Sequence, residues 1–265
     1  MTSEPATSGK WGDLSQRLLS GGLAAALGLW LMWIGGVPFK FLVSAIVGIM
    51  VWEVARMVGA ARLAVPLGAL SAVIMVALAV LPTGLVLPLV FLPALIGVAR
   101  LEVYRVRFAV FSTAILIAGL GLFVLREEFG FLWMLWLALV VIVSDVLGYF
   151  AGRVIGGPKF WPKVSPKKTW SGTLAGWLGA ALIGLIYMLN GTAGVEIIGI
   201  SVAIAIAGQM GDVAESALKR TVGIKDSSSI LPGHGGMFDR FDSMLGASLF
   251  LLIVGQIIDF PPVPL

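Results

Sequence analysis

The sequence has no cysteine and only one histidine, His234. The lack of cysteine excludes disulfide bonds and thiolate metal sites, and a single histidine argues against a zinc site built from several histidines. Charged residues are also scarce, at 12% of the chain against about 25% in soluble proteins. In their place the chain has apolar runs of about 18 residues or more, the length needed to cross a bilayer. We therefore expect an all-α polytopic integral membrane protein.

Nine hydrophobic segments are candidates for membrane-spanning helices. The fourth is short and contains Pro88 and Pro93, so we expect a kinked or partly re-entrant helix there. Residues 1–17 form a polar head, and residues 18–265 are expected to form a single transmembrane domain. The nine segments are Leu18–Gly36, Phe41–Val58, Ala64–Leu81, Leu85–Ala99, Phe108–Leu125, Phe131–Phe150, Gly172–Leu189, Gly194–Met210 and Met244–Ile258.

Basic residues are distributed unequally between the loops on the two sides of these segments. With nine spans, 16 of the 18 lysines and arginines fall on the side of the N-terminus, and only Lys40 and Arg126 fall on the other. Loops rich in lysine and arginine stay in the cytoplasm. We therefore expect a cytoplasmic N-terminus and an external C-terminus.

Acidic side chains are concentrated at the predicted cytoplasmic ends of three spans. Asp145 lies late in the sixth segment, Asp212 and Glu215 follow the eighth, and Asp239 and Asp242 precede the ninth. The members of each pair are three residues apart, so on a helix they share one face. Any single one could be a solvated boundary residue. As a set of hard oxygen ligands at one depth they suit Mg²⁺, which binds carboxylates together with substrate phosphates.

Another ionisable pair, Glu53 and Arg56, lies within the second hydrophobic segment. The two residues are also three positions apart and would share one face of a helix. They could form a simple intramembrane ion pair, and a structural role is favoured over a catalytic one.

Two polar stretches interrupt the apolar pattern on the predicted cytoplasmic side. Residues 153–170 interleave five basic residues with glycines and prolines, which fits either anionic lipid headgroups or a phosphate-rich substrate. They contain no Walker A sequence, so a P-loop nucleotide site is not predicted. The second stretch, Ser216–Ser243, has glycines and a proline in its middle, and we expect a shaped loop there. Glycines around His234 indicate backbone packed close to a ligand.

The second stretch also has a fixed order of residue types. A serine and a Lys-Arg step are followed by Lys-Asp, an apolar-Pro step, His-Gly-Gly and Asp-Arg-apolar-Asp, all within 27 positions. This order resembles the motif of the CDP-diacylglycerol synthases, also called phosphatidate cytidylyltransferases. The matching residues are Ser216, Leu218, Lys219, Arg220, Lys225, Asp226, Ser228, Leu231, Pro232, His234, Gly235, Gly236, Met237, Asp239, Arg240, Phe241 and Asp242.

The resemblance extends upstream, so that the motif-bearing part covers residues 144–243. Val146 and Ser171 depart from the family pattern, in which threonine and glutamate are frequent at those places. The N-terminal half resembles the family only in being hydrophobic with several spans. The upstream matches are Asp145, Tyr149, Gly152, Arg153, the run Ser165–Trp170, and Gly211-Asp212 with Glu215-Ser216.

The resemblance implies an enzyme that joins CTP to phosphatidic acid, giving CDP-diacylglycerol and pyrophosphate for phospholipid biosynthesis. It would lie in the cytoplasmic (inner) membrane of a bacterium, with its active site facing the cytoplasm. The lipid phosphate would attack the α-phosphorus of CTP, with positioning and electrostatic stabilisation as the main contributions. No nucleic-acid partner is implied. Small residues in the spans leave room for a homodimer in the bilayer.

Roles for individual residues follow from the same resemblance. Mg²⁺, with room for a second ion, would be held by Asp212 and Asp239, assisted by Glu215, Asp242 or Asp145. We expect His234 to contact the nucleotide or a phosphate rather than act as a general base. The full catalytic set is Asp212, Asp239, Lys219, Arg220 and His234, and the substrate-binding set is Ser165, Lys167, Lys168, Thr169, Ser216, Lys225, Asp226, Gly235, Gly236 and Arg240.

Other classes of membrane protein compete with this interpretation. A transporter for a phosphorylated lipid would place its binding groups near the midplane, whereas here they cluster at the ends of spans. Another CTP-dependent enzyme, such as a polyprenol or dolichol kinase, is disfavoured by the match in the final loop. The Asp-Gly and spaced aspartates of a CDP-alcohol phosphotransferase do not occur together here.

Overall fold

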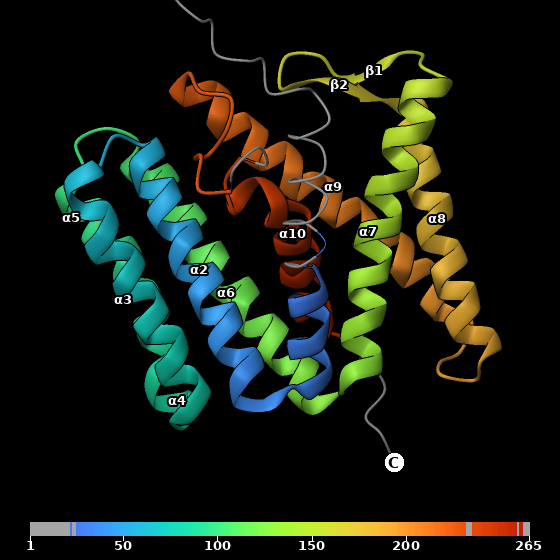
Figure 1. Ribbon diagram of the computed structural model, residues 1–265, viewed down its shortest axis with the longest axis horizontal. Helices are drawn as coiled ribbons and strands as arrows, with labels where there is room; N and C mark the ends of the chain where they lie inside the picture. Colours follow the sequence, from blue (N-terminus) through green and yellow to red (C-terminus); the bar gives the residue numbers. More distant parts are fainter. Residues whose placement is uncertain (1–21, 23–24, 232–234, 259, 262–265) are drawn as a thin grey trace, which may run out of the picture.

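The computed structural model describes Gly22 and residues 25–231, 235–258 and 260–261. Most of these residues are helical, and a two-stranded antiparallel sheet lies at one end of the helices (Figure 1). A short apolar helix, Ala25–Ile34, comes first. The elements that follow are α2 (Gly36–Met57), α3 (Ala61–Val80), α4 (Thr83–Val86), η1 (Leu87–Phe91), α5 (Leu92–Arg100), α6 (Arg105–Glu128), α7 (Phe131–Val154), β1 (Lys159–Trp161), β2 (Ser165–Thr169), α8 (Trp170–Leu189), α9 (Glu196–Val222) and α10 (Phe238–Val254).

Seven helical segments of the described chain are long and apolar enough to cross a membrane. They correspond to the second to eighth segments predicted from the sequence. The first predicted span lies partly outside the described residues. The ninth corresponds to α10, which has 17 residues. A mostly helical, polytopic membrane protein is therefore confirmed, while nine spans and the orientation of the termini stay predictions.

The fourth predicted span is irregular, as its prolines indicated. Thr83–Arg100 consists of α4, the 3₁₀ helix η1 and α5 in succession. Pro88 and Pro93 each lie in the first turn of their own helical piece. Proline fits the first turn because its missing N–H would have no partner within the helix.

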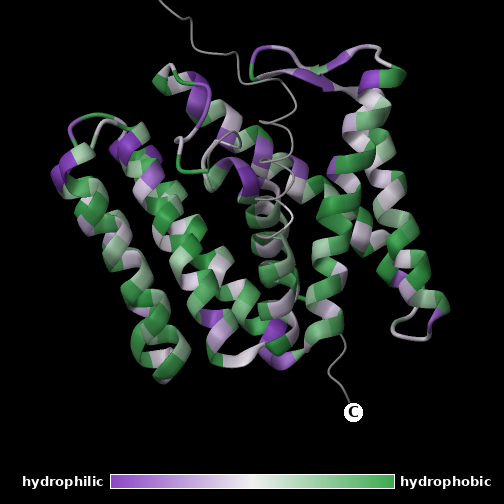
Figure 2. Cartoon of the chain, viewed as in Figure 1, coloured by the Kyte–Doolittle hydropathy of each residue, from purple (hydrophilic) through white to green (hydrophobic). Residues whose placement is uncertain are grey.

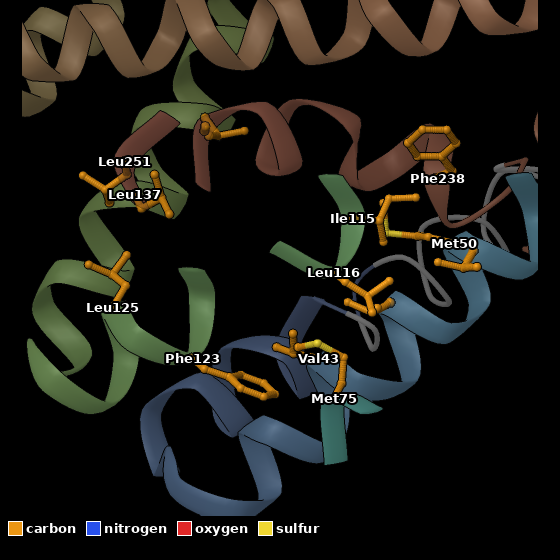
Figure 3. Packing of buried hydrophobic residues seen from close by; sticks show 14 of the residues in the cluster. Val43, Met50, Met75, Ile115, Leu116, Phe123, Leu125, Leu137, Phe238 and Leu251 are labelled. Atoms are coloured by element: carbon orange, nitrogen blue, oxygen red, sulfur yellow. The ribbon is translucent and has the colours of Figure 1, made fainter. Parts of the chain in front are cut away.

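Besides residues of α8 and α9, the hydrophobic core joins α2, α3, α6, α7 and α10. Figure 3 shows side chains from these helices meeting inside the bundle, among them Met50, Met75, Ile115 and Phe238. A Cβ at Gly48 would lie 2.9 Å from the carbonyl oxygen of Gly68, so glycine allows α2 and α3 to pack backbone to backbone. Close contact through small residues is a common way for helices to associate in lipid.

The two ends of the bundle differ in polarity (Figure 2). The β1–β2 hairpin, the end of α9 and the start of α10 lie at the same end as the α2–α3 and α5–α6 connections (Figure 1). These are the segments whose basic residues the sequence assigned to one side. The grouping of the loops agrees with the expected topology, and the compartment that they face stays a prediction.

Both polar stretches contain more regular structure than the sequence suggested. Within Ser216–Ser243, α9 continues to Val222 and α10 begins at Phe238, so both flanks of this stretch are helical. Gly223 ends α9 in the left-handed region, at φ 77°, a conformation that favours glycine at a helix end. The stretch 153–170 is also not a plain loop, because β1 and β2 pair within it. The glycines and prolines of this stretch did not predict strands, so the short hairpin was not expected from the sequence.

Candidate active site

Two glycines bring α9 and α10 into direct contact beside the acidic residues. A Cβ at Gly211 of α9 would overlap the carbonyl oxygen of Asp242, and a Cβ at Gly246 of α10 would overlap that of Ala207. Each would also lie about 3 Å from backbone atoms of the other glycine, at 3.1 Å and 3.0 Å respectively. The close crossing places the residues that follow Gly211 against those that precede Gly246.

Three carboxylates meet at this crossing. One oxygen from each of Asp212, Glu215 and Asp242 lies within 4.8 Å of the other two. Glu215 is 1% exposed, and its Oε1 is buried with no hydrogen-bond partner. Buried carboxylate oxygens without a partner are costly, and carboxylates this close repel one another when ionised. A bound cation would offset both the missing hydrogen bond and the repulsion between the carboxylates, so the donor set fits a hard divalent ion such as Mg²⁺.

Asp212 is held by groups from two elements. Lys168 of β2 forms an ion pair with its Oδ2 at 2.6 Å, and Ser216, one turn along α9, donates to its Oδ1 at 3.2 Å. Asp145 of α7 lies next to the same cluster, with its Oδ1 3.5 Å from the hydroxyl of Ser243. Helices α7, α9 and α10 and the hairpin therefore all contribute to one site.

Lys219 lies between two further carboxylates. Its ammonium nitrogen is 2.5 Å from Glu215 Oε2 and 2.6 Å from Asp239 Oδ1. Glu215 and Lys219 are both in α9 and four residues apart, a spacing that allows side-chain pairing on a helix. Lys219 thus links the carboxylate cluster to the start of α10.

Asp239 holds the loop that precedes it. Its Oδ2 accepts hydrogen bonds from the backbone N–H of Ser227 at 3.0 Å, the Ser227 hydroxyl at 3.0 Å and the backbone N–H of Gly236 at 2.8 Å. Burial alone would raise the pKa of Asp239, but the hydrogen bonds from Lys219, Gly236 and Ser227 lower it to about 2. Asp239 therefore remains ionised and ties the loop to α10.

Glu53 has a different role from the one expected. Instead of pairing with Arg56, its carboxylate accepts hydrogen bonds from Ser228 and from the backbone N–H groups of Met237 and Phe238. The guanidinium of Arg56 lies over the ring of Trp52, 4.9 Å from its centroid. The expected intramembrane ion pair is wrong: the Glu53 carboxylate instead accepts N–H groups at the start of α10, which have no partner within that helix.

A polar cavity of about 580 Å³ opens beside the carboxylates. This volume lies within the range of about 300–1,000 Å³ found for small-molecule sites. The cavity is bounded by α7, β2, α8 and α9. Its lining combines basic, hydroxyl and acidic side chains with backbone at glycines, namely Ser144, Asp145, Gly148, Tyr149, Gly152, Arg153, Lys167, Lys168, Thr169, Gly172, Thr173, Gln209 and Asp212.

The hairpin is fixed to the helices by its last residue. Thr169 pairs with Lys159 in the sheet and also begins α8, where its hydroxyl accepts the N–H of Gly172 at 3.3 Å. A Cβ at Gly172 would lie 3.4 Å from the carbonyl carbon of Gly148, so α7 and α8 are close at this level. The N-cap and the close packing together direct Lys168 towards Asp212.

Comparison with known proteins identifies the family. A family model described as the cytidylyltransferase family matches residues 15–258. The chain belongs to this family. It is 34% identical over 264 residues to a phosphatidate cytidylyltransferase of Brucella suis, covering 95% of this chain and 97% of that protein. It is 31% identical over 271 residues to the phosphatidate cytidylyltransferase of Bacillus subtilis, covering 90% and 96% of the two chains.

The cytidylyltransferase fold gathers some of the predicted site residues and separates others. Asp212, Glu215, Asp242 and Lys168 meet directly, and Lys167 and Thr169 line the cavity. Asp239 and Lys219 form an adjoining network with Gly236. The side chains of Arg220, Lys225, Asp226 and Arg240 are exposed, Ser165 is partly buried at the start of β2, and Gly235 pairs with Leu231 in an isolated bridge. His234 lies outside the described residues.

Sequence reasoning did not single out Gln209 as part of the site. Its amide oxygen accepts the indole N–H of Trp177 at 3.0 Å, and its amide nitrogen is 3.4 Å from Ser144 Oγ. Its backbone carbonyl lies 3.4 Å from the ammonium group of Lys168. The sequence signal that could have identified Gln209 is a polar amide inside an apolar run, three residues before Asp212.

Proposed function

We propose that this protein transfers the cytidylyl group of CTP to phosphatidic acid, forming CDP-diacylglycerol and pyrophosphate. The observation that carries the proposal is the cluster of Asp212, Glu215 and Asp242 beside a basic cavity, in a member of the cytidylyltransferase family. Similar chains named phosphatidate cytidylyltransferase support the lipid substrate. We further propose that residues 18–265 form one catalytic domain of nine spans.

Asp212, Glu215 and Asp242 would hold the divalent cation, with Asp145 beside them. When bound, Mg²⁺ would supply positive charge against the phosphate oxygens of the nucleotide. Burial, followed by the neighbouring carboxylate of Asp212, raises the pKa of Asp242 well above its usual range. A bound cation would favour the ionised form of this carboxyl. Asp239, expected among the ligands, is proposed instead to hold the loop.

Basic residues of the cavity would neutralise the two polyanionic substrates. Lys168 lines the cavity beside its ion-pair partner Asp212, and Arg153 and Lys167 also line it. Lysine and arginine contacts to phosphate suit this task because the main barrier is bringing like charges together. Arg220 of α9, Arg240 of α10, Lys225 and His234 remain candidates for substrate contacts.

The chemistry needs positioning more than proton transfer. An anionic oxygen of phosphatidate forms a bond to the α-phosphorus of CTP, and the bond from that phosphorus to the bridging oxygen of the β-phosphate breaks. The electron pair leaves with pyrophosphate, so negative charge develops on the leaving group. Lys168 and the other basic side chains of the cavity would stabilise that charge. No general base is required, since the attacking oxygen is already ionised.

The cavity lies at the basic end of the bundle. We propose that the protein lies in the inner membrane of a bacterium and that this end faces the cytoplasm. CTP would enter from that side, and phosphatidic acid would enter from the bilayer. Small residues on the spans leave room for a homodimer.

The decisive experiment is an assay of the purified protein in mixed micelles. With CTP, phosphatidic acid and Mg²⁺ we expect CDP-diacylglycerol, identified by mass, together with pyrophosphate, and no product when EDTA replaces Mg²⁺. A polyprenol offered in place of phosphatidic acid serves as the control acceptor. Failure to form CDP-diacylglycerol, or transfer of phosphate to the polyprenol, would contradict the proposed function.

A further inference from the structure

Glu53 is a buried carboxylate that belongs to none of the motifs and makes no direct contact with the carboxylate cluster. It lies in α2, within the N-terminal half of the chain, and is 0% exposed. Its Oε1 is 2.5 Å from the hydroxyl of Ser228 and 2.9 Å from the backbone nitrogen of Met237, and its Oε2 is 2.7 Å from the backbone nitrogen of Phe238. One side chain therefore contacts Ser228, in the segment between α9 and α10, and the backbone at the start of α10.

The bonds to Met237 and Phe238 satisfy N–H groups at the start of α10. The first N–H groups of a helix have no partner within it, and a carboxylate beside them also interacts favourably with the helix dipole. No side chain of α10 or of its N-cap residue Met237 fills this role through a capping hydrogen bond. A carboxylate from another helix supplies the cap.

The Glu53 carboxylate lies close against Gly236. A Cβ on Gly236 would overlap both the Ser227 hydroxyl and Glu53 Oε1. Asp239 holds the same loop from the other side, through Ser227 and the N–H of Gly236. The base of the loop is thus clamped between a carboxylate of α2 and a carboxylate of α10.

This clamp is connected to the candidate metal site. Asp239 lies in the first turn of α10 and shares Lys219 with Glu215, and Asp242 follows one turn later. A shift at the start of α10 would therefore move Asp242 and disturb the Lys219 link to Glu215. Movements of 1 Å at such sites are costly because ligand geometry is set by the groups behind the ligands.

We propose that Glu53 is a positioning residue that fixes the start of α10, and through it the carboxylates that hold the divalent cation. The proposal deepens the proposed function and rests on it only for the identity of the reaction. The placement of α10 and the binding of a metal ion are tested without turnover.

The test compares Glu53→Gln with Glu127→Gln in the full-length protein in detergent. Glu127 is the matched control, since its Oε1 accepts the backbone N–H of Gly36 at 3.0 Å at the start of α2, about 25 Å along that helix from Glu53. Glutamine at position 53 turns one acceptor oxygen into a donor that faces a backbone N–H or the Ser228 hydroxyl. We expect faster hydrogen exchange at Met237 and Phe238, and half-saturation by Mn²⁺ at a concentration about 10–100-fold higher.

Ser228→Ala is a second variant, which removes one of the three hydrogen bonds and leaves the carboxylate in place. It should raise the Mn²⁺ concentration at half-saturation by about two- to tenfold. Wild-type exchange at Met237 and Phe238 in Glu53→Gln, or wild-type Mn²⁺ binding in both variants, overturns the proposal. A lower Tm in Glu53→Gln without selectively faster hydrogen exchange at Met237 and Phe238 also overturns it, since a purely structural carboxylate would behave in that way. Absence of CDP-diacylglycerol synthesis by the wild type would instead count against the proposed function.

Discussion

The two ends of the helix bundle use charge in different ways. At the end away from the cavity, polar groups are matched locally. Lys40 pairs with Glu127 at 3.2 Å, Arg126 donates to the carbonyl oxygens of Met32 and Trp33, and Glu196 accepts the N–H of Gly194. These contacts join neighbouring segments, and Glu127 and Glu196 take part in separate interactions.

At the cavity end, carboxylates share partners and one oxygen has none. Lys168 and Lys219 contact Asp212, Glu215 and Asp239, while Asp242 joins the cluster and Glu215 Oε1 stays buried without a hydrogen bond. Matched charge is sufficient to hold a bundle together. Unmatched, buried charge destabilises a protein and persists where function requires it. We therefore propose that the charges of one end are structural and that those of the cavity end take part in the reaction.

The largest expected effect is the loss of turnover when a carboxylate of the cluster becomes neutral. Asp242→Asn and Asp212→Asn keep the shape of the side chain but remove charge needed to hold the cation. We expect kcat/KM to fall by about 10²–10³-fold or more, as when a single charge-stabilising group is removed from an active site. CDP-diacylglycerol formation measures the change. Near-normal activity in both variants would place the reaction elsewhere.

A change in helix spacing should have the next largest effect. Gly211→Ala forces α9 and α10 apart where the carboxylates meet, because its Cβ would overlap the carbonyl oxygen of Asp242. Overpacking of this kind costs about 1–3 kcal/mol, and we expect at least a tenfold loss of activity as the cluster opens. Gly199→Ala is the control, since it lies in the same helix with nothing within 4 Å of its Cβ. Equal activity in the two variants would show that the close crossing is not needed.

Lys168 should affect substrate binding more than stability. In Lys168→Met the cavity loses a cation beside Asp212, and the KM for CTP should rise by about tenfold, the effect of roughly 1.4 kcal/mol. Lys163→Met, in the turn of the same hairpin, removes an exposed charge and should leave the KM unchanged. Steady-state kinetics at fixed phosphatidic acid and saturating Mg²⁺ distinguish the two. The same rise in both variants would indicate a general surface-charge effect instead.

The smallest effect is expected at the opposite end. Glu127→Gln weakens the contacts to Lys40 and Gly36, and because Glu127 is about one-third exposed, solvent screening limits the loss to about 1 kcal/mol or less. Thermal unfolding in detergent should show a slightly lower Tm with unchanged kcat and KM. A large loss of activity would contradict the view that the charges at this end have only a structural role.

Much of this arrangement could be predicted from local sequence. Hydrophobic runs located the seven spans found among the described residues, and the prolines of the fourth span marked its irregular course. The three-residue spacing of Asp212 and Glu215 correctly indicated a shared helix face, because α9 continues through both. These features depend on periodicity and on the length of apolar runs, which are properties of short segments.

The parts that could not be predicted depend on contacts between distant segments. Asp239 and Asp242 have the same spacing as Asp212 and Glu215, yet Asp239 turns to Lys219 and the loop while Asp242 joins the cluster. Glu53 interacts with residues 175 or more positions away rather than with Arg56 three positions along. Sequence spacing indicates which residues share a helix face, but the packing of the helices determines which groups that face contacts.

Binding of Mn²⁺ to the purified protein tests the central claim most directly. Electron paramagnetic resonance of free Mn²⁺ during a titration would compare the wild type with Asp242→Asn and Glu127→Gln. We predict a site in the wild type that Glu127→Gln retains and Asp242→Asn loses. Equal binding by all three proteins would contradict the assignment of Asp212, Glu215 and Asp242 as the metal centre.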